Sequence, residues 1–369
     1  MAWQETFLNS IGPGPLAGLT FGDWVRLLAQ NRFAVAPRYV PRTIAVTVQA
    51  VPNSFFRALE EWRFKKKWEQ EAIAPPVFVL GHWRSGTTHL HNLLTIDKRF
   101  AFPNTYQCLF PHTFLTTETM SAPLLGHFVP KTRAMDNMAL TLDSTQEDEF
   151  ALSLDCFRSP FMGWVFPSHQ HDYDKYLTFE GANRRDVEAW NDALIKFLQK
   201  LTFKHKKPMV LKSPPHTARV AMLLKLFPDA KFVHIHRNPY HVYQSSIKTF
   251  MCNTMMAVQR PRPEQLEDHT LGQYTRLYDA FFEQRKLIPA GNYHEMSFEE
   301  LDRNPVESVR KLYAALSLPY FGEAESGLRQ YVATLAGYKK NAFPEMQPEL
   351  RRRIGATWRR SFEEWGYEV

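Results

Sequence analysis

The residues best suited to chemistry lie in the segment Gly81-His-Trp-Arg-Ser-Gly-Thr-Thr88, which directly follows the apolar run Val77–Leu80. After it, Leu90, Leu93 and Leu94 recur at helical spacing. This pattern predicts a strand, a glycine-containing turn and the start of a helix. Backbone N–H groups in such a turn, together with the positive end of the helix, bind phosphate groups. The segment therefore predicts a site for the anionic end of a nucleotide.

The side chains of this turn fit the same chemistry. Gly86 allows the backbone to approach an anion closely, and Ser85, Thr87 and Thr88 offer hydroxyl groups. Arg84 supplies a guanidinium that can pair with two oxygens of an anion. The structural alternative is a tight turn with an ordinary helix cap and an exposed arginine.

The glycines of the turn have the spacing of a Walker A loop, but Thr87 stands where the phosphate-binding lysine of that loop would be. Walker-type kinases also need a carboxylate at a strand end to hold Mg²⁺. Here two later apolar runs, Met209–Leu211 and Phe232–Ile235, lead into the cations Lys212 and Arg237. Cations at strand ends favour transfer of a sulfuryl group without a metal, because this group carries less charge than a phosphoryl group.

Strands and helices alternate along the chain after the double proline Pro75-Pro76. Further elements are expected as helices over 218–227, 241–249 and 305–315 and a strand over 292–296. Such alternation predicts a parallel sheet covered by helices on both faces, with the ligand beyond the carboxyl ends of the strands. We therefore predict an α/β, P-loop-like fold of three layers over residues 75–369, preceded by a helical N-terminal extension over residues 1–74.

The bulk composition is that of an ordinary globular chain, since 44% of the 369 residues are hydrophobic and 22% are charged. The net charge is +7, but the basic residues fall in separate clusters at 63–67, 204–207 and 351–360. This dispersion favours small acidic ligands or an anionic surface over nucleic acid.

Cysteine spacing and hydropathy bear on the compartment. Cys108, Cys156 and Cys252 are too far apart in the sequence for a zinc motif or a disulfide framework. The first residues do not show a secretory signal pattern, and no stretch approaches the roughly 18 apolar residues of a membrane span. We therefore expect a cytoplasmic protein, whose oligomeric state the sequence does not indicate.

One segment of the N-terminal extension, Ile44–Leu59, permits two interpretations. Ile, Val and Phe recur in it with few charges, and the cationic cluster Arg63–Lys67 follows. It could be a helix packed on the core with a solvated charged end, or a helix that rests on a membrane surface. The extension is therefore a candidate for peripheral membrane contact.

The turn Gly81–Thr88, together with Arg237-Asn-Pro and with Ser245 eight residues after Arg237, resembles the sulfotransferases that use 3′-phosphoadenosine-5′-phosphosulfate (PAPS). Three other segments are similar to the bacterial branch related to tyrosylprotein sulfotransferases, namely Leu211–His216, Glu295–Pro305 and Trp358–Tyr367. The resemblance extends from Pro75 to the C-terminus and implies the P-loop-like fold of that family.

The resemblance also implies roles for individual residues. Arg84 is similar to the basic residue that contacts the leaving 5′-phosphosulfate, and the stretch 85–88 to the groups that bind its phosphate. Arg237 and Ser245 resemble the clamp for the 3′-phosphate. Lys212 matches a lysine that would act as a second cation on the sulfuryl oxygens.

A second basic segment occupies a place where the family often closes a loop over the 3′-phosphate. It contains Lys339 and Lys340. A pair of lysines on a solvated surface fits the sequence equally well. We therefore expect Lys339 and Lys340 either to bind the nucleotide or to face water.

Transfer to a hydroxyl or an amine also needs a group that accepts the acceptor's proton. Glu147 is the first candidate, because on a helix it shares a face with Phe150, Ala151 and Leu154 and so points toward the core or a pocket. However, Ser144 and Glu147 also have the spacing of a capping box, in which the carboxylate only serves the helix N-terminus.

His216 is the second candidate for the base, since it lies four residues beyond Lys212. It could equally be a polar residue at a helix start. Relatives often carry a Trp-Glu pair soon after the first helix, where this chain has Tyr106-Gln107. Gln107 cannot act as a base, which leaves Glu147 and His216.

These observations predict a sulfotransferase that moves a sulfuryl group in line from PAPS to an acceptor hydroxyl, with an amine as the alternative and without a metal. The acceptor is expected to be a small molecule or a lipid. The aromatic residues Phe157, Phe161, Trp164 and Phe166 could line an apolar acceptor pocket or simply pack in the core.

Two other functions compete with this one. A P-loop kinase using ATP and Mg²⁺ is disfavoured by Thr87 and by the missing strand-end aspartate. A non-catalytic nucleotide-binding or membrane-associated protein would keep the fold without turnover.

Overall fold

The computed structural model describes residues 14–126, 129–130, 132–133, 135–136, 138–253, 256–337 and 343–369. In this part of the chain, four parallel strands form one sheet in the order β2-β1-β3-β4. Their bounds are β1 Val77–Leu80, β2 Val210–Lys212, β3 Lys231–His236 and β4 Tyr293–Ser297. Val79 is in register with Lys212, and Leu80 with His234, so the carboxyl ends of the central strands meet at one edge.

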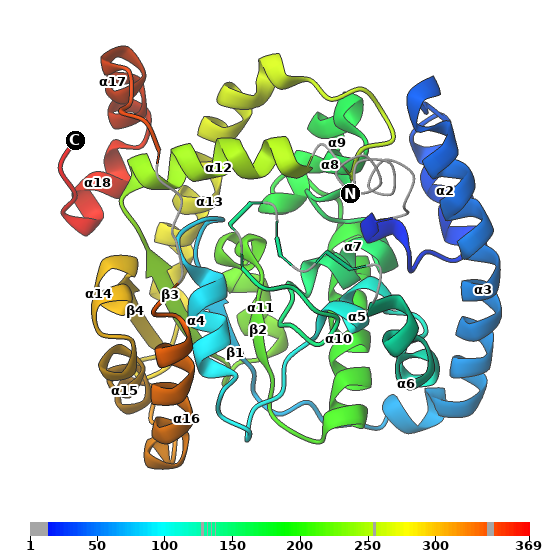
Figure 1. The fold of residues 1–369 in the computed structure, drawn as a ribbon, viewed down its shortest axis with the longest axis horizontal. Helices are drawn as coiled ribbons and strands as arrows, with labels where there is room; N and C mark the ends of the chain where they lie inside the picture. The colour runs from blue at the N-terminus through cyan, green and yellow to red at the C-terminus, as the bar shows by residue number, and fades with distance from the viewer. Residues whose placement is uncertain are drawn as a thin grey trace.

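Helices cover both faces of the sheet, as the sequence predicted (Figure 1). One face places Val77 and Val79 of β1 in a cluster with apolar residues of helices α4 Thr87–Leu94, α15 Pro305–Ala315 and α16 Phe321–Thr334. The other face places Phe78 and Leu80 in a larger core with α10 Arg184–His205, α11 Val220–Leu226 and α13 Leu266–Gln284. Alternate residues of one short strand thus reach opposite layers, and the three-layer α/β fold is confirmed.

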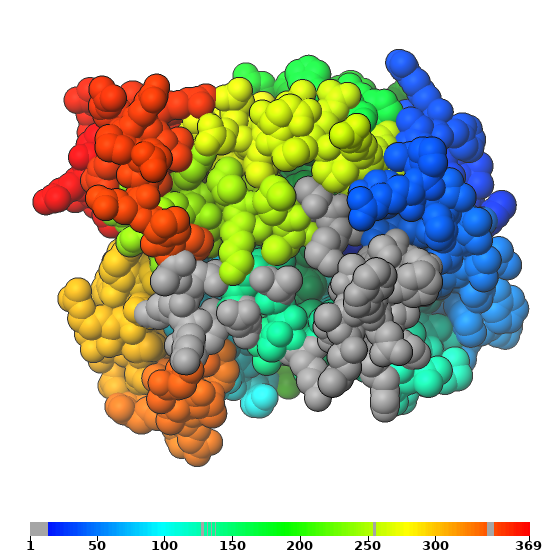
Figure 2. Space-filling model, turned by 45° about the horizontal axis from the view of Figure 1, so that its top comes forward, coloured from blue at the N-terminus to red at the C-terminus, as the bar shows by residue number. Residues whose placement is uncertain are grey.

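The remaining helices surround this central unit. In the described residues they are α2 Phe21–Gln30, α3 Val40–Trp68, α5 Thr105–Leu109, α6 Phe114–Leu125, α7 Glu149–Cys156, α8 Met162–Val165, α9 Gln170–Asp174, α12 Pro239–Asn253, α14 Phe298–Arg303, α17 Pro348–Thr357 and α18 Arg359–Trp365. The N-terminal helices α2 and α3 lie at one edge of the molecule, and α14 to α18 lie at the opposite edge (Figures 1 and 2). The predicted division of the chain at Pro75 stays a prediction.

Three helices begin elsewhere than the hydrophobic pattern indicated. α4 begins at Thr87, because Gly86 caps it in the left-handed conformation. α12 begins at Pro239, where proline is preorganised for the first helical position. The helix expected over 218–227 is divided: Pro214–Ala218 form a 3₁₀ helix, and α11 starts only after Arg219, whose backbone is not helical (φ −127°, ψ 21°).

In the part of the chain that the structure describes, no helix has both the length and the apolar character needed to cross a bilayer.

Buried histidines make the stability of this fold depend on pH. His91 of α4 is fully buried, and its Nε2 lies 3.2 Å from the Val210 carbonyl oxygen. Burial and the nearby Lys212 lower the pKa of His91 to about 3. In the unfolded chain the same group titrates near its ordinary value of 6.5. Its contribution to stability is therefore complete above pH 6.5 and is lost as the pH falls toward 3.

We expect His91 alone to lower the free energy of unfolding by about 2 kcal/mol between pH 7 and pH 5. Denaturant unfolding at the two pH values measures this change. His91→Gln retains an N–H for the Val210 carbonyl and should remove this part of the pH dependence. His171→Gln, at an exposed position, is the control and should leave the dependence as it is. An unaltered pH dependence in His91→Gln would contradict the assignment.

Candidate active site

The turn after β1 is shaped by two glycines in left-handed or otherwise positive-φ conformations. Gly81 has φ +143° and Gly86 has φ +101°. A Cβ at Gly86 would lie 2.4 Å from Cδ2 of Phe298, and one at Gly81 would lie 2.5 Å from the carbonyl oxygen of Ile235. Both contacts are too short for any side chain, so the close packing of the turn against β3 and α14 requires glycine.

The polar residues of the turn divide into two groups. Ser85 is fully buried and donates from Oγ to the His82 carbonyl, 2.8 Å away, so its hydroxyl stabilises the turn itself. Thr87 is buried and Thr88 is half-buried at the first turn of α4. The N–H groups of a first helical turn have no partners within their own helix and are directed out of its end. The geometry of an anion cradle is thus present at Gly86–Thr88.

Arg84 is directed toward the residue expected to clamp the 3′-phosphate. Its Nε donates to Ser245 Oγ at 2.8 Å, and its Nη1 donates to Asp136 Oδ2 at 2.8 Å. Nε of Arg133 lies 3.3 Å from the other oxygen of Asp136. Burial raises the pKa of Asp136, but Arg133 and Arg84 outweigh burial and hold this pKa below its ordinary value. Asp136 therefore remains a carboxylate that orients Arg84.

Arg237 closes β3 and completes this cationic corner. Its Nη1 donates to the carbonyl oxygen of Arg84 at 3.4 Å, and its guanidinium carbon lies 4.3 Å from the centre of the Phe298 ring. Burial lowers the pKa of Arg237 from its ordinary value, and Arg84 adds to this effect. Nε of Arg237 is buried and has no hydrogen-bond partner among the described residues. The structure thus brings together Arg84, Arg237 and Ser245, and leaves one buried cationic N–H available.

Glu147 and Lys212 form a buried ion pair at the end of β2. Nζ of Lys212 donates to Oε1 of Glu147 at 2.6 Å, and the two side chains are 3% and 12% exposed. Burial lowers the pKa of Lys212, while Glu147 acts in the opposite direction. Glu147 is thus the more exposed member of the pair.

The capping-box interpretation of Glu147 was wrong. Helix α7 begins only at Glu149, so Glu147 precedes the helix instead of lying on it. Ser144 Oγ accepts a hydrogen bond from the Thr141 N–H, and the Glu147 N–H donates to Gln146 Oε1. The Glu147 carboxylate therefore serves Lys212 and not a helix N-terminus.

His216 lies behind this pair in a closed polar network. It is 0% exposed, and its Nε2 is 2.6 Å from Oδ2 of Asp148. Ser213 Oγ donates to the other oxygen of Asp148 at 2.9 Å. Burial raises the pKa of Asp148, but His216 and Ser213 outweigh it and keep this pKa low. His216 is thus enclosed and bound to Asp148 through Nε2, while Nδ1 is buried without a hydrogen-bond partner among the described residues. Because the ring is 0% exposed, the geometry favours Glu147 over His216 as the group that meets an acceptor.

The structural role of a third carboxylate in the same run, that of Glu149, was not predicted from the sequence. Oε2 of Glu149 accepts from Nη1 of Arg219 at 2.7 Å, and Oε1 accepts from Nη2 at 3.0 Å, with both side chains 0% exposed. The guanidinium carbon of Arg219 also lies 5.0 Å from the centre of the Phe179 ring and 4.8 Å from that of Trp190. The three consecutive carboxylates at 147 to 149 therefore hold the end of β2 and the segment after it. They do so by pairing with Lys212, His216 and Arg219.

Other residues of the sequence analysis have different outcomes. Gln107 is buried in a capping box with Asn104 on α5, which is a structural role. Lys339 and Lys340 lie outside the described residues. Among the described residues, no group of three or more His, Cys, Asp or Glu side chains is placed to hold a metal ion.

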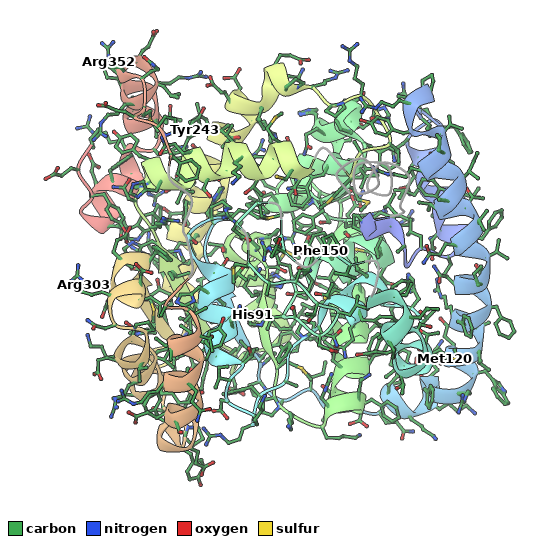
Figure 3. The ribbon with its side chains drawn as sticks, in the orientation of Figure 1. His91, Met120, Phe150, Tyr243, Arg303 and Arg352 are labelled. Atoms are coloured by element: carbon green, nitrogen blue, oxygen red, sulfur yellow. The ribbon has the colours of Figure 1, made fainter. Side chains whose placement is uncertain are left out.

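An aromatic series leads from the Glu147 region to a surface cavity. The ring of the half-buried Phe150, labelled in Figure 3, is 4.9 Å from that of Phe161, which stacks on Trp164 at 4.2 Å. Trp164 also approaches Trp83 of the turn at 6.3 Å. Trp164 and Phe250 line a cavity of ≈ 100 Å³.

Of the four aromatic residues proposed for an acceptor pocket, Trp164 lines this cavity and Phe161 stacks on Trp164. All four residues belong to the main core, so Phe157 and Phe166 have a packing role. The cavity has an aromatic wall that reaches Trp83 in the turn after β1.

The turn after β1, Arg237 and Ser245 meet on a three-layer α/β fold, and comparison with known proteins shows the family to which this chain belongs. The profile of the sulfotransferase family matches residues 75–322. The chain belongs to this family.

Individual relatives extend the match to nearly the whole chain. The chain is 37% identical to the omega-hydroxy-beta-dihydromenaquinone-9 sulfotransferase Stf3 of Mycobacterium bovis, over 95% of this chain and 90% of the relative, and the same values hold for Stf3 of Mycobacterium tuberculosis. Among solved structures, sulfotransferase STF9 from Mycobacterium avium superposes with a TM-score of 0.73 at 20% identity, covering 91% of this chain and 88% of STF9. STF1 from Mycobacterium tuberculosis H37Rv gives a TM-score of 0.65 at 17% identity, covering 91% and 90%.

Proposed function

We propose that this sulfotransferase takes its sulfuryl group from PAPS and transfers it to a hydroxyl group of an apolar acceptor. The observation that carries the proposal is the meeting of Arg84, Arg237 and Ser245 beside the phosphate-binding turn, with a buried Arg237 N–H that has no partner among the described residues. When bound, PAPS supplies the sulfuryl group and a phosphoadenosine leaving group.

The residues present fit a nucleotide with phosphates at both ends. The Gly86–Thr88 turn can receive the 5′-phosphate, because the N–H groups at the start of α4 have no partners within their own helix. Arg237 and Ser245 would hold the 3′-phosphate, and the pair Lys339-Lys340 would close over it. We favour PAPS over ATP as the donor because the strands end in cations, whereas a triphosphate with Mg²⁺ needs a strand-end carboxylate.

Four residues would carry out the transfer. Arg84, oriented by Asp136, would stabilise the negative charge on the oxygen that links phosphate and sulfuryl group. Lys212 would donate hydrogen bonds to the sulfuryl oxygens, and Glu147 would accept the proton of the acceptor hydroxyl. His216 would act indirectly, by fixing Asp148 and thus the segment that carries Glu147.

The acceptor class follows from the aromatic wall and from the relatives. The name of Stf3 describes a sulfotransferase for a hydroxylated menaquinone, which is a lipid. In this chain the series Phe150, Phe161 and Trp164 joins the Glu147 region to a cavity. We therefore propose a lipid or another hydrophobic molecule with a hydroxyl group as the acceptor, and an amine as the secondary choice.

Nucleotide binding tests the donor. Titration calorimetry should show tighter binding of adenosine 3′,5′-bisphosphate than of ATP, with no requirement for Mg²⁺. Arg237→Ala should weaken the bisphosphate by about 10- to 100-fold, because it removes a charged hydrogen bond to the 3′-phosphate. The loss should be smaller for adenosine 5′-phosphosulfate, which lacks that phosphate.

The matched control is Arg303→Ala on α14, whose exposed side chain points away from the body of the molecule (Figure 3). It should bind the bisphosphate as the wild type does. Equal affinity for ATP and adenosine 3′,5′-bisphosphate, or wild-type affinity for the bisphosphate in Arg237→Ala, would exclude PAPS as the donor. The kinase and the non-catalytic nucleotide-binding protein would then be the remaining functions.

A further inference from the structure

Helix α3 presents an apolar side to solvent, while its buried side contains Val46, Ala50 and Trp68 together with polar residues. On the exposed side, five large apolar side chains recur at spacings of 4, 3, 4 and 7 residues, which places them within a narrow stripe along the helix. These residues, the α3 stripe, are Ile44 (58% exposed), Val48 (67%), Val51 (58%), Phe55 (66%) and Trp62 (83%). From Ile44 to Trp62 the stripe covers 18 residue steps, or about 27 Å.

The opposite side of α3 faces the protein and holds polar groups. Arg42 donates to the Ala257 carbonyl at 2.9 Å, Asn53 donates to the Leu19 carbonyl at 2.9 Å, and Glu60 pairs with Lys200. These buried bonds fix the rotation of the helix about its axis. The α3 stripe is therefore held outward by the fold and cannot turn inward without breaking them.

Other exposed apolar residues gather near the stripe. These residues are Phe21 and Val25 of α2, Phe33 between α2 and α3, Val40 at the start of α3, and Met120 and Leu124 of α6. Met120 lies on the same side of the molecule as α3 (Figure 3), and the N-terminal helices form that side of the space-filling view (Figure 2). A concentration of this kind marks an interaction surface.

The charges around the stripe indicate the kind of partner. In α3 the first carboxylate is Glu60, which is buried, so the first twenty residues of the helix carry no negative charge. The exposed cations Arg63, Lys65, Lys66 and Lys67 follow the stripe at the end of the helix. An apolar stripe with a cationic end matches a bilayer that contains anionic headgroups. Contact with a second copy would pair the face with itself and bring no surplus of carboxylates to these cations.

We propose that α3 lies on a lipid bilayer through this stripe, with Arg63 to Lys67 on anionic headgroups. The position of the stripe relates this contact to the proposed acceptor cavity. The Ala36 N–H donates to the Val258 carbonyl, and the Val258 N–H donates to the Val165 carbonyl on α8, next to the cavity wall at Trp164. The start of α3 is thus tied to the segment beside the cavity. Along this side a lipid acceptor would pass from the bilayer to the cavity. This step rests on the proposed function.

Vesicle flotation tests the contact without any measurement of catalysis. The wild type should float with vesicles of phosphatidylcholine and phosphatidylglycerol, and more weakly with phosphatidylcholine alone. Val51→Ser/Phe55→Ser should lower the partition coefficient by about 10- to 100-fold. Leu287→Ser/Tyr320→Ser removes side chains of matched exposure (58% and 68%) elsewhere on the surface and should bind as the wild type does. Lys65→Gln/Lys66→Gln should weaken binding to anionic vesicles by about 10-fold or more.

Two outcomes would overturn the proposal. One is absence of vesicle binding by the wild type, or an equal loss in both pairs of serine variants. The other is a dimer in light scattering that Val51→Ser/Phe55→Ser converts to a monomer, since the face would then join two copies. Binding of adenosine 3′,5′-bisphosphate, measured on the same samples, separates this inference from the proposed function. Nucleotide binding without vesicle binding refutes only the membrane contact, and the reverse result refutes only the donor assignment.

Discussion

Glu147→Gln is expected to lower kcat by about 10²- to 10⁴-fold, the usual loss when a general base is removed. The glutamine keeps an oxygen that can accept the hydrogen bond from Lys212, now 2.6 Å from the carboxylate, but it cannot take a proton. Single-turnover transfer from PAPS to an excess of acceptor measures the change. The affinity for adenosine 3′,5′-bisphosphate should be unaltered, because Glu147 is not among the residues proposed to bind the nucleotide.

The same variant separates two roles for this carboxylate. If Glu147 only orients Lys212, the glutamine would preserve most of the rate. If Glu147 is the base, most of the activity should be lost. A rate within about threefold of the wild type would therefore remove Glu147 from the mechanism. His216→Asn is the companion variant and should lower the stability of the protein more than it lowers the rate of transfer.

Glu149→Ala is expected to destabilise the protein by about 3–5 kcal/mol, because it leaves the guanidinium of Arg219 buried without a counter-charge. Both partners are 0% exposed and share two hydrogen bonds. Such a loss is a large part of the roughly 5–15 kcal/mol by which a domain is stable. Equilibrium unfolding in urea measures it.

A solvent-exposed pair supplies the comparison. Glu363 lies 2.7 Å from Arg359 on α18, where the two side chains are 64% and 74% exposed. Glu363→Ala should cost less than about 1 kcal/mol, because water already screens that pair. Similar losses in Glu149→Ala and Glu363→Ala would show that the interior at Arg219 admits water in solution.

Local sequence pattern was sufficient for the bounds of two elements. β1 and α15 have the predicted bounds, because a run of buried β-formers and a proline at a helix start are local signals. The approach of Arg84 and Arg237 followed from the rule that the carboxyl ends of parallel strands share one edge, whereas Ser245 was expected only from the family resemblance. Sulfotransferase membership rested on the same residues and is confirmed.

The sequence did not predict side-chain contacts that form only in the tertiary fold. Asp136 carries no motif, and its contact with Arg84 joins residues 52 apart in the chain. No local pattern marks Glu149 as buried, yet it pairs in the interior with Arg219, 70 residues further along the chain. Ser144 and Glu147 have the spacing of a capping box, but the helix starts only at Glu149. The carboxylate of Glu147 instead accepts a hydrogen bond from the buried Lys212. Each of these outcomes depends on a long-range pairing that periodicity does not encode.

The contacts that define the candidate site connect distant parts of the chain. Arg84 and Ser245 are 161 residues apart, Arg84 and Arg237 are 153 apart, and Glu147 and Lys212 are 65 apart. Closing such large loops costs entropy before any contact repays it, so these pairs form late when the chain folds. During refolding, the ability to retain adenosine 3′,5′-bisphosphate should therefore return after secondary structure has recovered. Newly made chains would thus become able to bind the donor only once strands β1, β2 and β3 lie side by side.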